Sequence, residues 1–256
     1  MPTRKEEKEL RQFFFKKTRK KQNSFVVEGE RALSELLKST WKILKLFTEP
    51  QKVHKIRSLI PLESTLQVEE VSAKKLAEWT ETETPPGILA LVEKRTCTLE
   101  EVIAEKQVLI LDNLKDPGNV GTLLRTAHSL NWGGVVMLKG TVELFSPKVV
   151  RSTAGALFHL KITDDAIPEA AVERLKKNNF TIWVADSHSG VSPEECKDLI
   201  NQTPGKVALV IGGEAAGVSR EILTKTDHFV RIPLSKGAES LNAAVSGGIL
   251  MYLLRR

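Results

Sequence analysis

Three short stretches in the second half of the chain place amide, carboxylate, hydroxyl and guanidinium groups beside glycines. The first, DPGNVGTLLRTA, holds Asn119 and, six residues later, Arg125. The second, IGGEAAGVS, carries a single carboxylate, Glu214, and the third, IPLSKGAESLN, ends with Ser240 and Asn242. A cation beside a helix N-terminus suits phosphate, and a carboxylate can accept hydrogen bonds from hydroxyls. These stretches therefore favour a ligand that carries phosphate and hydroxyl groups.

Each stretch also has a simpler structural explanation. Arg125 can be a surface arginine, and the glycines before Ser219 can form a tight turn that this serine caps. Ser240 is a good N-cap for the last helix, and Asn119 is a natural N-cap for the helix after DPGN. GxGxxG and GK[ST] patterns are absent, which argues against a dinucleotide-binding or P-loop site.

The order of predicted elements brings the three stretches together. Four apolar runs alternate with helical patterns and predict strands: QVLILD (107–112), GVVMLK (134–139), FTIWVAD (180–186) and KVALVIGG (206–213). A further strand-like run is VRIPL. Such a pattern predicts a mostly parallel sheet with helices on both faces, and ligands bind at the carboxyl ends of parallel strands. We therefore expect the three stretches to line one pocket.

The last helix contains adjacent glycines, Gly247 and Gly248, after several small residues. Each glycine costs about 1 kcal/mol in a helix relative to alanine. The pair predicts that another backbone passes close to this helix.

The first part of the chain differs in composition. Residues 1–22 hold nine basic and three acidic residues, so this arm accounts for the whole net charge of +6. A basic arm attracts polyphosphates, although it can equally be a solvated helix end. Within it, we expect Phe13, Phe14 and Phe15 to anchor the arm to the core. Strands and helices alternate over 23–93 and predict a small α/β domain, followed by a charged linker (94–106) and a domain over 107–256.

Composition limits where the protein works. The two cysteines, Cys97 and Cys196, lie far apart and favour ordinary thiols in a reducing compartment. No apolar run approaches the roughly 18 residues of a membrane span, and the N-terminus lacks an apolar signal core. We expect a cytoplasmic protein without membrane contact.

The three stretches in this order resemble the three signature motifs of the SpoU/TrmH family of RNA 2′-O-ribose methyltransferases, in the SPOUT class. The resemblance covers about residues 107–256. The preceding domain is similar to the small substrate-binding domain of that family, which resembles ribosomal protein L30e. The resemblance implies a deep trefoil knot that binds S-adenosylmethionine, with the last helix as the threaded segment, and a homodimer.

The resemblance also implies a role for individual residues. Asp186 and Ser187 follow a strand in the place of a loop that closes over the cofactor, although the Thr- or Ser-Leu pair of many relatives is absent there. No metal is implied. The cofactor would bind mainly through backbone groups of Ala185, Gly212, Gly213, Glu214, Ile232, Leu234, Ser240, Leu241 and Asn242.

Arg125 would be the central catalytic residue. The family assigns it the removal of the 2′-OH proton, whereas a guanidinium, which stays protonated at neutral pH, is better suited to holding the substrate phosphate. Asn119 and Glu214 would orient Arg125 or the ribose, and Ser240 and Asn242 would shape the meeting point of cofactor and nucleotide. His128, His159 and His188 lie outside the motifs, and we expect no catalytic role for them.

The resemblance also implies a structured RNA as the substrate, and ribosomal RNA is the expected one. A transfer RNA 2′-O-methyltransferase and a non-catalytic RNA-binding protein of the same fold are the alternatives. A nucleotide-dependent enzyme is disfavoured, because phosphate-loop and metal-ligand patterns are absent.

Overall fold

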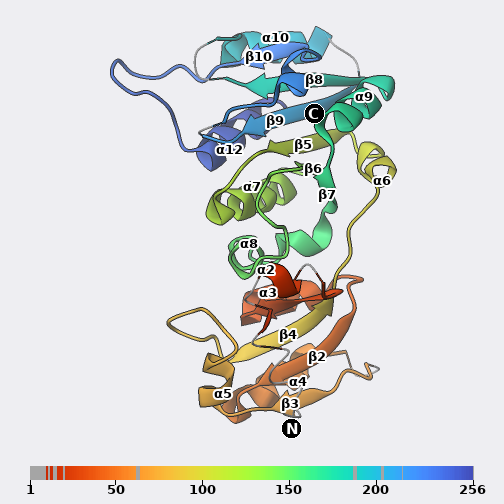
Figure 1. Ribbon diagram of the computed structural model, residues 1–256, viewed down its shortest axis with the longest axis vertical. Helices are drawn as coiled ribbons and strands as arrows, with labels where there is room; N and C mark the ends of the chain where they lie inside the picture. The colour runs from red at the N-terminus through yellow and green to blue at the C-terminus, as the bar shows by residue number, and fades with distance from the viewer. Residues whose placement is uncertain are drawn as a thin grey trace. The chain divides into compact units, whose positions relative to one another are not determined.

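The computed structural model describes residues 10, 12, 13, 16–19, 21–61, 64–186, 189–202, 205–214 and 216–255 (Figure 1). The chain forms two compact units. The N-terminal unit comprises Met1–Arg95 together with Glu143–Phe158, and the C-terminal unit comprises Thr96–Val142 with His159–Arg256. The domain boundaries drawn from the sequence stay a prediction.

The N-terminal unit contains a four-stranded sheet in the order β1-β4-β2-β3. Strand β4 (Ile88–Glu93) pairs antiparallel with β1 (Ser24–Glu28) and with β2 (Ile43–Thr48), and β2 pairs parallel with β3 (Val68–Glu70). The remaining elements are α2 (Lys16–Arg19), α3 (Glu30–Leu37), η1 (Pro50–Lys52), α4 (Val53–Leu59), α5 (Ala73–Ala77), α8 (Pro147–Ser152) and η2 (Ala156–His159).

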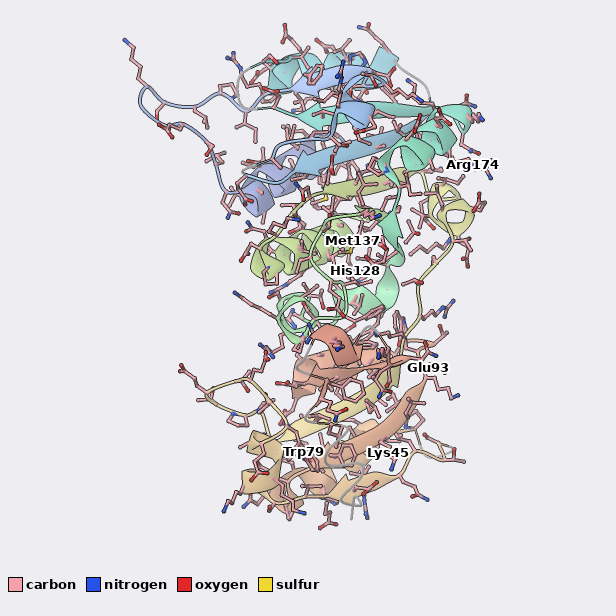
Figure 2. All side chains as sticks on the ribbon, in the orientation of Figure 1. Lys45, Trp79, Glu93, His128, Met137 and Arg174 are labelled. Carbon is pink, nitrogen blue, oxygen red and sulfur yellow. The ribbon has the colours of Figure 1, made fainter. Side chains whose placement is uncertain are left out.

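The N-terminal arm is held to the core of this unit. Phe13 is buried in a cluster with Phe47 and Trp79, which is labelled in Figure 2. Its anchoring role is therefore confirmed, while Phe14 and Phe15 lie outside the described residues. The Arg19 guanidinium pairs with the Glu143 carboxylate at 3.1 Å and donates to the Phe13 carbonyl at 3.0 Å. Arg19 therefore serves as a buried structural cation. Of the other basic residues of the arm, five fall outside the described residues: Arg4, Lys5, Lys8, Arg11 and Lys20.

The C-terminal unit contains a six-stranded sheet in the order β10-β8-β9-β5-β6-β7, and every pairing in it is parallel. The expected α/β architecture is confirmed. The strands are β5 (Gln107–Asp112), β6 (Gly134–Leu138), β7 (Lys161–Ala166), β8 (Phe180–Ala185), β9 (Lys206–Gly212) and β10 (His228–Val230).

Helices cover both faces of this sheet (Figure 1). On one face α6 (Leu99–Ile103), α9 (Pro168–Lys177) and α11 (Arg220–Leu223) bury apolar side chains against alternate strand residues. Helices α7 (Pro117–Ser129) and α12 (Ala243–Leu253) pack together on the other face, and α10 (Pro193–Gln202) contacts α12. None of the helices in the described part of the chain has the length and apolar composition that a membrane span requires.

Two expectations about the strands were incomplete. The run VRIPL was expected to be a strand, but β10 ends at Val230 and the chain then leaves the sheet as a loop. Strand β7, KITDDA, has mostly polar residues, because it is the edge strand beside β6 and only Ile162 in it is buried. Its sequence therefore lacks the apolar run that identified the other strands.

The adjacent glycines of α12 face side chains of other elements, not a backbone. A Cβ atom on Gly247 would overlap Leu123 of α7, whereas one on Gly248 would lie 3.6 Å from the Thr126 methyl group. The expectation of a close backbone was therefore wrong. Gly247 instead makes room for a buried leucine between two packed helices.

Candidate active site

A cavity of about 510 Å³ opens at the carboxyl ends of the central strands of the C-terminal unit. It is walled by the loop after β9, by residues at the end of β8, and by the loop 231–242, which extends from β10 to α12 (Figure 1). Its lining comprises Val184, Ala185, Asp186, Ile211, Gly212, Gly213, Glu214, Ala216, Gly217, Val218, Leu223, Val230, Ile232, Leu234, Ser240, Leu241, Ala243, Ser246 and Leu250.

The loop after β9, residues 212–219, has a backbone that leaves no room for side chains at its start. A Cβ on Gly212 would lie 2.6 Å from the carbonyl carbon of Gly217. A Cβ on Gly213 would overlap the carbonyl oxygen of Asn113, at the start of the loop after β5. The glycines therefore bring two loops of the C-terminal unit into backbone contact, which fixes one wall of the cavity.

A chain of hydrogen bonds joins the three sequence motifs. The side-chain amide of Asn119 donates to the Glu214 carboxylate at 2.7 Å, and its oxygen accepts from the Asn242 amide at 2.9 Å. Asn119 lies in the first turn of α7, Glu214 in the loop after β9, and Asn242 at the start of α12. Residues that are far apart in the sequence thus form one polar cluster, whose Glu214 lines the cavity.

Two of the three predicted N-caps were assigned to the wrong residue. Helix α7 begins one turn earlier than expected, with Asp116 as N-cap and its carboxylate accepting the backbone N–H of Asn119 at 2.7 Å. At α12 the cap is Asn242, whose side-chain oxygen accepts from the N–H groups of Ala244 and Val245. Because Asn119 is not the cap, its side chain can donate to Glu214. Ser240 lies in the loop before α12, where it lines the cavity. The third cap, Ser219, does precede α11, but its side chain makes no capping hydrogen bond.

Arg125 lies on the exposed side of α7, more than two turns from the helix start. It is not part of the cavity lining, and within the described residues no hydrogen bond or ion pair engages its guanidinium. The structure therefore leaves this cation available to an external anion.

The structure describes the other candidates in part. Ser187 and His188 lie outside the described residues. His128, at the end of α7 (Figure 2), stacks on His159 with ring centroids 4.9 Å apart, and neither lines the cavity. In the described ranges no group of three or more His, Cys, Asp or Glu residues could hold a metal ion. The apolar floor of the cavity was not predicted from the sequence, because apolar strand and helix residues that face a pocket cannot be told from core residues. The floor comprises Val184, Ile211, Val218, Leu223, Val230 and Leu250.

Two known protein families match this chain, one over its N-terminal part and one over its C-terminal part. The model of the SpoU rRNA Methylase family matches residues 106–252, and the model of the MRM3-like substrate binding domain matches residues 5–90. The chain therefore belongs to the SpoU rRNA methylase family. The predicted family and the predicted enzyme class, a methyltransferase, are confirmed.

Individual relatives match over nearly the whole chain. A Bacillus subtilis protein named 23S rRNA (guanosine(2553)-2′-O)-methyltransferase RlmP is 34% identical over 248 residues, which cover 97% of this chain and 95% of that protein. The crystal structure of an AdoMet-bound rRNA methyltransferase from Sinorhizobium meliloti is 26% identical, with a TM-score of 0.86, and covers 99% of this chain and 95% of that one. A putative RNA methyltransferase of the TrmH family from Porphyromonas gingivalis is also 26% identical, with a TM-score of 0.83, covering 100% of this chain and 98% of that one.

Proposed function

We propose that this protein transfers a methyl group from S-adenosylmethionine to a ribose 2′-hydroxyl in ribosomal RNA. The observation that carries the proposal is the hydrogen-bonded chain from Glu214 through Asn119 to Asn242, which gathers one residue from each motif beside a cavity. The names of the Bacillus and Sinorhizobium relatives support the reaction, the cofactor and the RNA class. An rRNA substrate would place the enzyme in the cytoplasm.

The cavity has the size and chemistry that S-adenosylmethionine requires. Its volume of about 510 Å³ suits a nucleoside-sized ligand. The apolar floor offers a surface for an adenine ring, and the backbone of Gly212, Gly213, Ile232 and Leu234 lines the cavity beside it. Glu214 and Ser240 can bind the hydroxyls or the amino group. Ala185 and Leu241 complete the predicted cofactor contacts that line the cavity, while Asn242 acts from the start of α12.

The remaining side chains would serve the RNA. When bound, S-adenosylmethionine supplies a methyl group on a positively charged sulfur, which is transferred in line to a nucleophilic oxygen. The guanidinium of Arg125, which has no partner in the described part of the chain, would hold the phosphate next to the reacting ribose and stabilise negative charge on the 2′-oxygen. Since arginine keeps its proton at neutral pH, the hydroxyl proton would leave to phosphate or water. Asn119 and Asn242 would fix the ribose against the cofactor.

The test is methylation of RNA from a host that lacks the gene. Purified protein is incubated with labelled S-adenosylmethionine and total RNA, and the modified ribose is mapped. We expect one labelled site in ribosomal RNA, and at least about a hundredfold loss of rate for R125A, as for other removed transition-state contacts. The matched control is R174A, because Arg174, labelled in Figure 2, is an exposed arginine on α9. Its guanidinium pairs with Glu100, outside the cavity. Full activity of R125A would contradict the role given to Arg125.

The same experiment separates the alternative functions. A Bacillus relative with 29% identity carries the name putative TrmH family tRNA/rRNA methyltransferase, so label in transfer RNA would replace ribosomal RNA as the substrate. A non-catalytic RNA-binding protein would incorporate no label. Calorimetry with S-adenosylmethionine distinguishes this alternative from the enzyme, because binding of RNA without binding of the cofactor would contradict the proposed methyltransferase activity.

We also propose that the protein is a homodimer. Helix α12 exposes Val245, Ile249 and Tyr252, which share one face because they are four and three residues apart. Such an apolar stripe favours burial against a second copy. V245D should convert a dimer to a monomer in light scattering, whereas I167D, at an exposed apolar residue before α9, should leave the mass unchanged. A monomeric wild type would refute the dimer. The deep trefoil knot likewise stays a prediction.

A further inference from the structure

Asp112, the last residue of β5, is a buried carboxylate behind the wall of the cavity. Only 2% of its surface is exposed, and it is not part of the cavity lining. A buried carboxylate is costly unless hydrogen bonds satisfy it. Its Oδ2 accepts the backbone N–H of Ser219 at 2.6 Å, and its backbone carbonyl accepts the N–H of Gly213 at 2.9 Å. One residue therefore binds both ends of the loop 212–219.

Among the described residues, this loop has few other hydrogen bonds, one of which runs from the Asn119 amide to the Glu214 carboxylate. Within it, the N–H of Gly217 donates to the carbonyl of Gly213 at 2.8 Å. The hydroxyl of Ser219 is buried and finds no hydrogen-bond partner among the described residues, so the loop is held at its end through the backbone N–H of Ser219. The bond to Asp112 is short and its acceptor is charged, which makes it stronger than a bond between neutral groups.

We propose that Asp112 is a positioning residue for the cofactor. Its carboxylate holds Ser219 so that the backbone around Gly212, Gly217 and Val218 keeps the shape of the cavity wall. The inference rests on the proposed function, which places S-adenosylmethionine in this cavity. Asp112 touches neither cofactor nor RNA, and its effect is on cofactor affinity, not on the chemical step.

The test compares two ways of breaking the same hydrogen bond. D112A removes the acceptor, and S219P removes the donor at a residue whose φ of −60° and ψ of 147° proline adopts readily. Each change should raise the Kd and the KM for S-adenosylmethionine by on the order of tenfold to a hundredfold, the range of a hydrogen bond to a charged group. The kcat at saturating cofactor and the KM for RNA should change by less than about threefold.

The chain offers a matched control in Asp227. Its Oδ2 accepts the backbone N–H of Ile182 at 2.8 Å, so it makes the same kind of bond at a position outside the cavity. D227A should lower thermal stability and leave the cofactor Kd unchanged. D112N retains an oxygen acceptor and should recover most of the affinity lost in D112A. S219A retains the N–H and should bind the cofactor at least tenfold more tightly than S219P.

The double variant D112A/S219P should bind no more weakly than either single variant, since both remove one bond. Additive losses, or wild-type affinity in S219P, would overturn the role of Asp112. A D112A variant that loses stability like D227A but keeps its cofactor Kd would show a structural role only. Absence of cofactor binding by the wild-type protein would instead refute the proposed function.

Discussion

At the scale of single residues, the amide of Asn119 has its orientation fixed from both sides. The Glu214 carboxylate only accepts hydrogen bonds, so the amide nitrogen of Asn119 must face it. The N–H groups at the start of α12 only donate, so the oxygen of Asn242 faces the helix and its nitrogen faces Asn119. The three side chains therefore form a directed chain with one consistent pattern of donors and acceptors.

This direction predicts the effect of a carboxylate at the centre of the chain. N119D keeps the oxygen that accepts from Asn242. It replaces the amide nitrogen, which lies 2.7 Å from the Glu214 carboxylate, with a negatively charged oxygen. We expect kcat/KM to fall by at least about a hundredfold, because the two adjacent carboxylates repel each other and the hydrogen-bonded chain between the motifs is broken. Adding E214Q restores a donor opposite the new carboxylate and should recover at least about tenfold of the loss. A double variant as inactive as N119D would show that the Glu214 charge itself is required.

A second residue-scale prediction concerns Glu28 in the N-terminal unit. Burial raises the pKa of its carboxyl above the ordinary value of 4.5, although the Thr80 hydroxyl and the Arg151 charge lower it in part. A raised pKa in the folded state gives stability at low pH that is lost as the pH rises through that pKa. The melting temperature of E28Q relative to wild type should therefore increase from pH 4 to pH 8.

The neighbouring residue Glu30 provides the opposite control. A hydrogen bond from Lys55 lowers the pKa of this partly exposed carboxyl, so its contribution to stability is present above the ordinary pKa and is lost as the pH falls. The melting temperature of E30Q relative to wild type should therefore decrease over the same pH interval, by a small amount because the pair is exposed. Parallel slopes for E28Q and E30Q would contradict the assignment for Glu28.

At the scale of elements, the burial of each strand determined whether the strand could be predicted from the sequence. Strands β5 and β6 are buried at every position and read as continuous apolar runs, whereas the edge strand β7 is polar and was missed. The three loops could be grouped, because the carboxyl ends of parallel strands share one edge. The bond between Asn119 and Glu214 could not be predicted, because it depends on β5 and β9 being neighbours in the sheet. The caps were misassigned because Asp116 and Asn119, like Ser240 and Asn242, are equally suitable residue types.

The packing of α12 on α7 predicts different effects for two adjacent glycines. G247A gains helix propensity but forces a methyl group onto the buried Leu123, so unfolding free energy should fall by about 1–2 kcal/mol. G248A meets only the Thr126 methyl group at an ordinary distance and should gain about 0.5–1 kcal/mol. Urea denaturation measures both. Equal effects of the two changes would contradict the packing, and L123A should relieve part of the strain of G247A.

At the scale of the whole molecule, the N-terminal unit is built from two separate parts of the chain. Residues 143–158 lie between β6 and β7 in the sequence but pack with residues 1–95. Phe145 packs against Phe25 with ring centroids 4.7 Å apart, and Phe158 packs against Trp41 at 5.6 Å. No local sequence pattern assigns residues 143–158 to the N-terminal unit, because an apolar segment has the same pattern in either hydrophobic core.

The arrangement predicts that residues 1–95 alone form an incomplete unit. Without residues 143–158, the fully buried Phe25 loses Phe145, and Arg19 loses its ion pair with Glu143. We expect this fragment to bind a hydrophobic dye and to show poor dispersion of its amide NMR signals. A synthetic peptide of residues 143–158 should restore the dispersion. A peptide with F145A and F158A should bind at least about tenfold more weakly, because burying each phenylalanine side chain contributes roughly 2 kcal/mol of binding free energy. A fragment that is well folded and ignores the peptide would show that residues 143–158 are only an attachment to a complete domain.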